Sequence, residues 1–254
     1  MQNRMTEVSI DNKFLTDNYF NKLEQIAIQY VHNNYNYCYL KAMHEKNREI
    51  GDRRDCRMKG IVNLYKPKGW TSRDAVNKVR NILHVKEVGH MGTLDPQGEG
   101  VLPIGIGKGT RLFDALLKKD KVYEAEFAFG YETPTLDGDS EPSRFTKTIP
   151  SKIEIESKLD EFVGVIRQVP PLYSAKNVNG ARAYDLARKG VDFTLEAAEV
   201  EVYSFELIKR TAENTYLMRI HCSAGTYIRS LCRDLAYSLD SLATMVSIKR
   251  GRAG

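Results

Sequence analysis

A glycine-rich stretch at residues 88–100 holds the residues best placed to do chemistry. It reads VGHMGTLDPQGEG, so four glycines and one proline surround a single histidine, His90, and a single aspartate, Asp95. Pro96 biases Asp95 away from helical geometry, which predicts a shaped loop that presents polar groups. A carboxylate in such a loop can serve as a nucleophile or as an acid–base group. The alternative for Asp95 is a turn or capping role.

Two other segments look like binding loops but fail the spacing that those loops need. The run GIGKGT at 105–110 resembles a phosphate loop. However, Leu102 stands where the Walker motif needs glycine, and Thr110 where the dinucleotide motif needs its third glycine. The run DGD at 137–139 opens like a calcium loop, but Pro142 stands where that loop needs glycine. These departures argue against nucleotide and calcium sites.

The composition of the chain limits which classes of protein are possible. The chain has 254 residues and a net charge of +5, which permits a polyanionic partner without requiring one. Its 28% charged residues and mean hydropathy of −0.45 are typical of a soluble protein. No stretch approaches 18 uncharged apolar residues and no secretory signal is recognised, so we expect a cytoplasmic protein that does not enter a membrane. The four cysteines lack disulfide-framework and zinc spacing, so we expect reduced thiols and no metal site.

The chain changes character near residue 58. All eight prolines and seventeen of the eighteen glycines lie beyond it. We interpret 58–254 as one catalytic domain. Residues 1–57 are either an N-terminal extension or the result of a start codon assigned too far upstream, because Arg53 and Arg54 could be encoded by a ribosome-binding sequence ahead of Met58.

Periodicity and capping signals predict an α+β fold with a mixed, mostly antiparallel sheet flanked by helices. Alternating or buried apolar runs predict strands at 61–65, 101–106, 123–129, 199–209 and 215–222. Helices are expected from an N-cap at 71–72, and at 110–119, 151–163, 182–189 and 226–239, with a loop at 86–100.

Six motifs in a fixed order resemble the TruB family, the synthases that make pseudouridine in the T loop of tRNA. They are GIVNLYKPKGWTS at 60–72, GHMGTLDP at 89–96, GEGVLPI at 98–104, KVY at 121–123, QVPPLYSA at 168–175 and GTYIR at 225–229. The resemblance runs from about residue 59 to 254. It implies the pseudouridine synthase catalytic fold, which agrees with the α+β expectation.

The resemblance implies that Asp95 is the catalytic carboxylate. It would attack C1′ of the ribose as a nucleophile, add to C6 of the uracil, or assist proton removal from C2′, and the sequence leaves these routes open. All three need an ionised Asp95. The family resemblance assigns its cationic partner to Arg229, which is in turn paired with Asp137. Without the motif, Arg229 would read as a solvated helix residue.

The same resemblance assigns the remaining pocket. Tyr123 would stack on the target base and remove the C5 proton, although an aromatic residue alternating in a strand is more often part of a core. His90 would order the everted nucleotides, Leu94 and Ile228 would wall the pocket, and Tyr227 would contribute to substrate binding.

The expected partner is the T arm of tRNA, bound by a monomer. Base flipping costs a few kcal/mol, which phosphate contacts and stacking must offset. The candidate phosphate contacts are Lys66, Lys68, Arg73, Lys108, Arg111 and Lys118. The isomerisation needs neither redox chemistry nor group transfer, so no cofactor and no metal are expected.

Three departures from the family pattern stand out. Asn177 occupies the usual lysine position after the double proline, and the late Leu-x-x-Leu-Arg-Arg signature is softened at residues 245–250. The chain stops at Gly254, where relatives generally continue into a C-terminal RNA-binding portion, so we expect either a shortened enzyme or a fragment of a longer chain. Two alternatives therefore remain: an RNA-binding or tRNA-folding chaperone without activity, and a synthase for another RNA.

Overall fold

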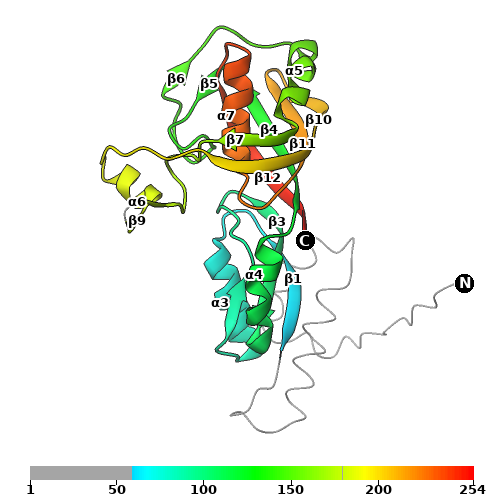
Figure 1. Ribbon diagram of the computed structural model, residues 1–254, viewed down its shortest axis with the longest axis vertical. Coiled ribbons are helices and arrows are strands. Elements are labelled where there is room, and N and C mark those ends of the chain that lie inside the picture. The colour runs from blue at the N-terminus through cyan, green and yellow to red at the C-terminus, as the bar shows by residue number, and fades with distance from the viewer. Residues whose placement is uncertain (1–58, 179) are drawn as a thin grey trace, which may run out of the picture. The chain divides into compact units, whose positions relative to one another are not determined.

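The computed structural model describes residues 59–178 and 180–254, so the expectations for residues 1–57 lie outside the described residues. An eight-stranded sheet runs through the described part of the chain (Figure 1). Its strands are β1 (Gly60–Lys66), β2 (Val88–His90), β3 (Glu99–Ile106), β4 (Lys121–Phe129), β7 (Gly164–Gln168), β10 (Ala198–Ala212), β11 (Thr215–Cys222) and β12 (Ala243–Ala253). Two short pairs lie outside it: β5 (Tyr131–Glu132) with β6 (Arg144–Phe145), and β8 (Asn177–Val178) with β9 (Ala181–Arg182).

The order of the strands makes the sheet mixed and mostly antiparallel. They follow the order β1-β3-β12-β4-β11-β10-β7, and β2 also pairs with β3. Within the described residues the neighbours in this sheet are antiparallel, except that β12 runs parallel to β3, with Lys249 opposite Glu99 and Arg250 opposite Gly100. This topology confirms the α+β class.

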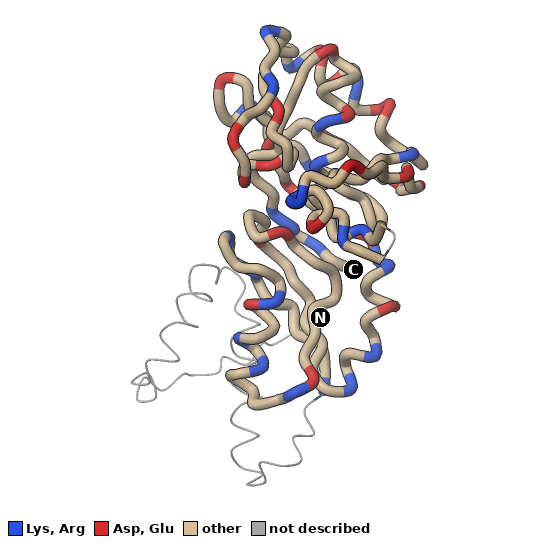
Figure 2. Tube along the Cα trace, turned by 90° about the vertical axis from the view of Figure 1, so that its left-hand side faces the viewer, with Lys and Arg blue, Asp and Glu red and all other residues tan. Residues whose placement is uncertain are grey.

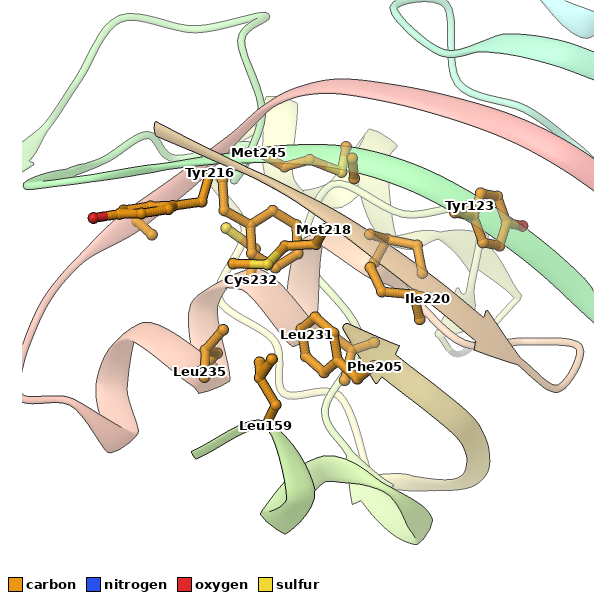
Figure 3. Packing of buried hydrophobic residues seen from close by; sticks show 14 of the residues in the cluster. Tyr123, Leu159, Phe205, Tyr216, Met218, Ile220, Leu231, Cys232, Leu235 and Met245 are labelled. Carbon is orange, nitrogen blue, oxygen red and sulfur yellow. The ribbon is translucent and has the colours of Figure 1, made fainter. Parts of the chain in front are cut away.

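One face of the sheet forms the main hydrophobic core. Strand β4 alternates, so Tyr123, Ala125 and Phe127 point to the same buried face. Helix α7 (Ile228–Ser238) packs on β12 and β4 and contributes Leu231 and Leu235 to this core. Figure 3 shows Tyr123 at the margin of the cluster, with its phenol oxygen directed away from the other labelled side chains.

The other helices differ in how they begin: two have capping boxes, one continues a 3-10 turn, and one follows a short strand without a side-chain cap. They are α3 (Ser72–Leu83), α4 (Phe113–Leu117), α5 (Lys152–Leu159) and α6 (Ala183–Arg188), with 3-10 turns η2 (Gly107–Leu112) and η3 (Asp160–Phe162). Thr71 caps α3 through a capping box, because its hydroxyl accepts from the Asp74 N–H while the Asp74 carboxylate accepts from the Thr71 N–H. No helix among the described residues is long and apolar enough to cross a membrane.

The expected elements are confirmed except in three places, and two strands of the large sheet and the four short strands β5, β6, β8 and β9 were missed. The helix expected at 151–163 ends at Leu159 and continues as the 3-10 turn η3. The helix expected at 110–119 is only α4, preceded by the 3-10 turn η2. In that turn Gly109 lies so close to β1 that a Cβ there would overlap the carbonyl of Gly60. The loop expected at 86–100 contains the short strand β2. Strands β7 and β12 were not anticipated.

Candidate active site

The loop that carries Asp95 is fixed by hydrogen bonds to its backbone. The Met91 N–H donates to the Pro103 carbonyl at 2.8 Å, and the Gly69 N–H donates to the Pro96 carbonyl at 2.8 Å. Inside the loop, the Gly98 N–H donates to the Asp95 carbonyl at 2.9 Å. Because these bonds join the loop to β3 and to the turn after β1, the position of Asp95 is set before any substrate binds.

Ser72 fixes the residue immediately before Asp95. Its hydroxyl accepts from the Leu94 N–H at 2.9 Å and donates to the Leu94 carbonyl at 3.0 Å. Both residues are buried, with 4% of each exposed. The first turn of α3 thus holds both backbone polar groups of Leu94.

Arg229 brings two carboxylates together. One of its terminal nitrogens lies 3.2 Å from Oδ2 of Asp95, and the other lies 3.0 Å from Oδ2 of Asp137. The side chains of Arg229 and Asp137 are 9% and 8% exposed, whereas that of Asp95 is 42% exposed. The guanidinium therefore joins a buried carboxylate to one that solvent or a substrate can reach, as the family motif implies.

Asp137 lies in a loop that satisfies its other oxygen. Oδ1 accepts from the Thr135 hydroxyl at 2.6 Å and from the Asp139 N–H at 3.0 Å. The Thr135 carbonyl accepts a further bond from Arg229 at 2.9 Å. The loop therefore offers both a carboxylate and a backbone carbonyl to the Arg229 guanidinium.

Gln168 holds the start of helix α7. Its side-chain oxygen accepts from the Tyr227 N–H at 2.8 Å, and its side-chain nitrogen donates to the Tyr227 carbonyl at 3.1 Å. Tyr227 is the N-cap residue of α7, and Ile228, which is 4% exposed, and Arg229 follow it directly. A buried amide at the end of β7 thus sets where α7 begins and where Arg229 points.

Tyr123 and Arg250 are neighbours on adjacent strands of the sheet. The two residues are opposite each other in the neighbouring strands β4 and β12, so the charge of Arg250 acts on the Tyr123 phenol. Burial raises the pKa of Tyr123 above its ordinary value of 10.0, while the charge of Arg250 acts in the opposite direction. Tyr123 is 8% exposed, and because its pKa is raised its phenol is neutral at neutral pH.

His90 is a neutral imidazole at the end of β2. Burial lowers its pKa below 6.5, and the neighbouring charge of Arg250 lowers it further. Its Nδ1 atom is buried and has no hydrogen-bond partner among the described residues.

The comparisons with known proteins decide the family. The family model described as TruB family pseudouridylate synthase (N terminal domain) matches residues 80–228. The chain belongs to this family. The matched range includes the three residues Asp95, Asp137 and Tyr123, and it ends one residue before Arg229.

Individual TruB relatives and solved structures agree with this result. A tRNA pseudouridine synthase B from Clostridium perfringens is 43% identical over 198 residues, which cover 78% of this chain and 67% of the relative. One from Lactococcus lactis subsp. cremoris is 41% identical over 201 residues, covering 76% and 61%. A crystal structure of a Cbf5-Nop10-Gar1 complex matches with a TM-score of 0.59 and 31% identity, over 77% of this chain and 49% of that chain. The chain thus spans about half the length of that solved protein.

One of the basic residues expected to contact phosphate, Lys66, has a different role in the structure. Lys66 is fully buried, and its ammonium donates to the carbonyls of Pro67, Trp70 and Pro96 at 3.0, 2.6 and 3.3 Å. Burial lowers its pKa to about 8, although Asp95 raises it. Because its donors face backbone oxygens and none of it is exposed, Lys66 supports the Asp95 loop and is not a phosphate contact.

The other basic candidates remain on the surface. Lys68, Arg73, Lys108, Arg111 and Lys118 are all exposed. The structure does not bring Arg111 into the Arg229 cluster: it lies in η2, and among the described residues the ion pairs of Asp95 and Asp137 are with Arg229.

Sequence reasoning missed three residues that support this site: Ser72, Gln168 and Arg250. Ser72 and Gln168 lie within family motifs, but a motif does not show which backbone groups its residues contact. Arg250 lay in the softened late signature, and a charged residue in an unrecognised strand gives no sign that it is buried.

Proposed function

We propose that this chain converts a uridine in the T loop of tRNA to pseudouridine. Relatives at 41–43% identity carry the name tRNA pseudouridine synthase B, which supports tRNA as the substrate. The reaction breaks the N1–C1′ bond, forms a C5–C1′ bond, and moves one proton from C5 to N1. The product is an isomer of the substrate, so catalysis depends on positioning the base and on transferring one proton.

The Asp95–Arg229–Asp137 cluster is the observation that carries this proposal. Attack on C1′, addition to C6 and removal of the C2′ proton all require the ionised carboxylate of Asp95. A guanidinium 3.2 Å away orients this carboxylate and balances its charge. Because the Asp95 side chain is 42% exposed while its partners are buried, it is the member of the cluster that can meet a flipped-out nucleoside.

Tyr123 completes the proposed reaction. In this role the phenol first passes its proton through water to N1, and the resulting phenolate oxygen accepts the proton from C5 after the uracil has turned. Acid–base groups of this kind contribute about 10²- to 10⁴-fold to a rate. The neutral His90, the buried Leu94 and Ile228, and Tyr227 at the start of α7 would form the surroundings of the base.

The distribution of charge supports an RNA partner for one part of the chain. Residues 59–120 contain eleven Lys and Arg against six Asp and Glu, whereas residues 121–254 contain eighteen against nineteen. Figure 2 shows this predominance of blue over red in the part that holds α3 and α4. The exposed basic residues there can neutralise phosphates, and that interaction weakens as salt is added.

A tritium-release assay tests the proposal. An unmodified tRNA transcript labelled with tritium at uracil C5 is incubated with the protein, in parallel with a transcript in which cytidine replaces the T-loop uridine. We expect tritium release from the first transcript and none from the second. Equal release from both would move the reaction to another uridine. Tight binding without release from either would identify an RNA-binding protein that lacks synthase activity.

A further inference from the structure

Arg250 is a charged residue with an unusual location. Only 1% of it is exposed, and it lies where β12 is paired on both sides, opposite Tyr123 of β4 and opposite Gly100 of β3. At Gly100 the strands approach so closely that a Cβ would overlap the Arg250 carbonyl oxygen. A guanidinium can be buried at such a crossing only if its donors find acceptors.

Its acceptors belong to the loop that carries Asp95 and to the strand that follows. Two terminal nitrogens donate to the carbonyls of Thr93 and Gly92, each at 3.2 Å, and Nε donates to the Val101 carbonyl at 2.8 Å. Ser72 holds both backbone groups of the intervening Leu94. Arg250 therefore fixes Gly92 and Thr93, the two loop residues that immediately precede Leu94. No other natural side chain offers five donors in one rigid fork.

The same guanidinium also faces Tyr123. It lies opposite Tyr123 in the neighbouring strand, and its charge lowers the pKa of the phenol against the stronger effect of burial. Its charge also lowers the pKa of His90, where burial is the larger cause. A cation at this position stabilises negative charge on the Tyr123 oxygen.

We infer that Arg250 is a positioning residue of the isomerisation, which orients the Asp95 loop through Gly92 and Thr93 and holds the Tyr123 oxygen ready to accept the C5 proton. This inference rests on the proposed function. In the step concerned, the Tyr123 phenol passes its own proton through water to N1, the C5–H bond breaks, and the C5 proton goes to the phenolate oxygen whose negative charge Arg250 stabilises, so that the phenol is restored.

Three variants separate this role from simple structural support. Arg250→Met removes the charge and the donors, Arg250→Lys keeps the charge, and Arg252→Met removes an exposed cation two residues along the same strand as a control. Single-turnover rates are measured on bound tRNA carrying hydrogen or deuterium at uracil C5. We expect Arg250→Met to lose at least about 100-fold, the lower end of what an acid–base group contributes. We also expect a larger C5 isotope effect than in the wild type, partial recovery in Arg250→Lys, and no change in Arg252→Met.

Two results would overturn the inference. One is a wild-type rate in Arg250→Met. The other is a slower rate with an unchanged isotope effect and no advantage of Arg250→Lys, which would indicate general damage to the fold. Should Arg250→Met fail to fold by circular dichroism, Arg250→Lys carries the test, because loss of the forked donors alone must then slow the reaction and raise the isotope effect.

Amide hydrogen exchange in the free protein keeps the inference separate from the proposed function. We expect Arg250→Met to exchange the amides of residues 92–95 at least about tenfold faster than Arg252→Met, with β4 and β11 equally protected in both. This lower bound corresponds to the loss of a single charged hydrogen bond, and the variant loses two to this loop. If the wild type makes no pseudouridine, the proposed function fails and exchange alone decides: unchanged protection of residues 92–95 overturns the positioning role.

Discussion

Replacing Arg229 with methionine would separate what the cluster contributes to stability from what it contributes to chemistry. The substitution leaves the Asp137 carboxylate, 8% exposed, with only the Thr135 hydroxyl and the Asp139 N–H on one oxygen. Leaving a buried charge without its partner costs about 3–5 kcal/mol of unfolding free energy. The exposed Asp95 adds little, since a pair that is accessible to solvent contributes about 1 kcal/mol or less. We therefore expect Arg229→Met to lose about 3–5 kcal/mol.

Urea unfolding of a double-mutant cycle measures this directly. The four proteins are the wild type, Arg229→Met, Asp137→Asn and the double variant, with Asp95→Asn as the exposed control. Because Asp137→Asn removes the orphaned charge, the double variant should lose at least about 1.5 kcal/mol less than the sum of the single losses. Asp95→Asn should stay within about 1 kcal/mol of the wild type. Additive losses, or a loss below about 1 kcal/mol in Arg229→Met, would refute this reasoning.

Three further predictions concern residues that support the site. Ser72→Ala leaves both backbone groups of Leu94 unpaired, so we expect a loss of about 2 kcal/mol in urea unfolding and slower single turnover with an unchanged tRNA Kd. Gln168→Leu does the same to Tyr227 and should cost about 2 kcal/mol, and an unchanged unfolding midpoint would contradict it. Lys66 has a pKa of about 8 against 10.5 in the unfolded chain, so the unfolded state binds more protons between these values. The wild type should therefore gain stability relative to Lys66→Met as the pH rises from about 8 towards 10.5, and a flat difference would show that its pKa is not lowered.

Local signals in the sequence predicted most of the fold. Helix α3 followed from the cap at Thr71 and its apolar face, and β4 followed from strict alternation between Tyr123 and Phe127. Strand β12 was not predicted because its register shifts between Met245 and Ser247 and again between Arg250 and Arg252. These shifts break the two-residue alternation by which a strand is recognised in a sequence. Strand β7 is a five-residue edge strand with exposed alternate positions, which gives too short a pattern.

The site could be predicted only in part, for a physical reason. Asp95, Asp137 and Arg229 are far apart in the chain, and only the order of the family motifs placed them together. The TruB motifs name residues but do not say which groups hold them. The burial of Lys66 and Arg250 depends on backbone carbonyls that converge from separate elements, and such convergence leaves no local trace in the sequence.

The most direct measurement of the central claim compares wild type with Asp95→Asn, which keeps the shape of the side chain and removes its charge. Both proteins are assayed for tritium release from C5-labelled tRNA, alongside tRNA Kd and urea unfolding. The account predicts unchanged binding and stability, with a rate lower by at least about 10⁴-fold, the scale on which removing a nucleophile acts. Release by Asp95→Asn within about tenfold of the wild type would contradict it.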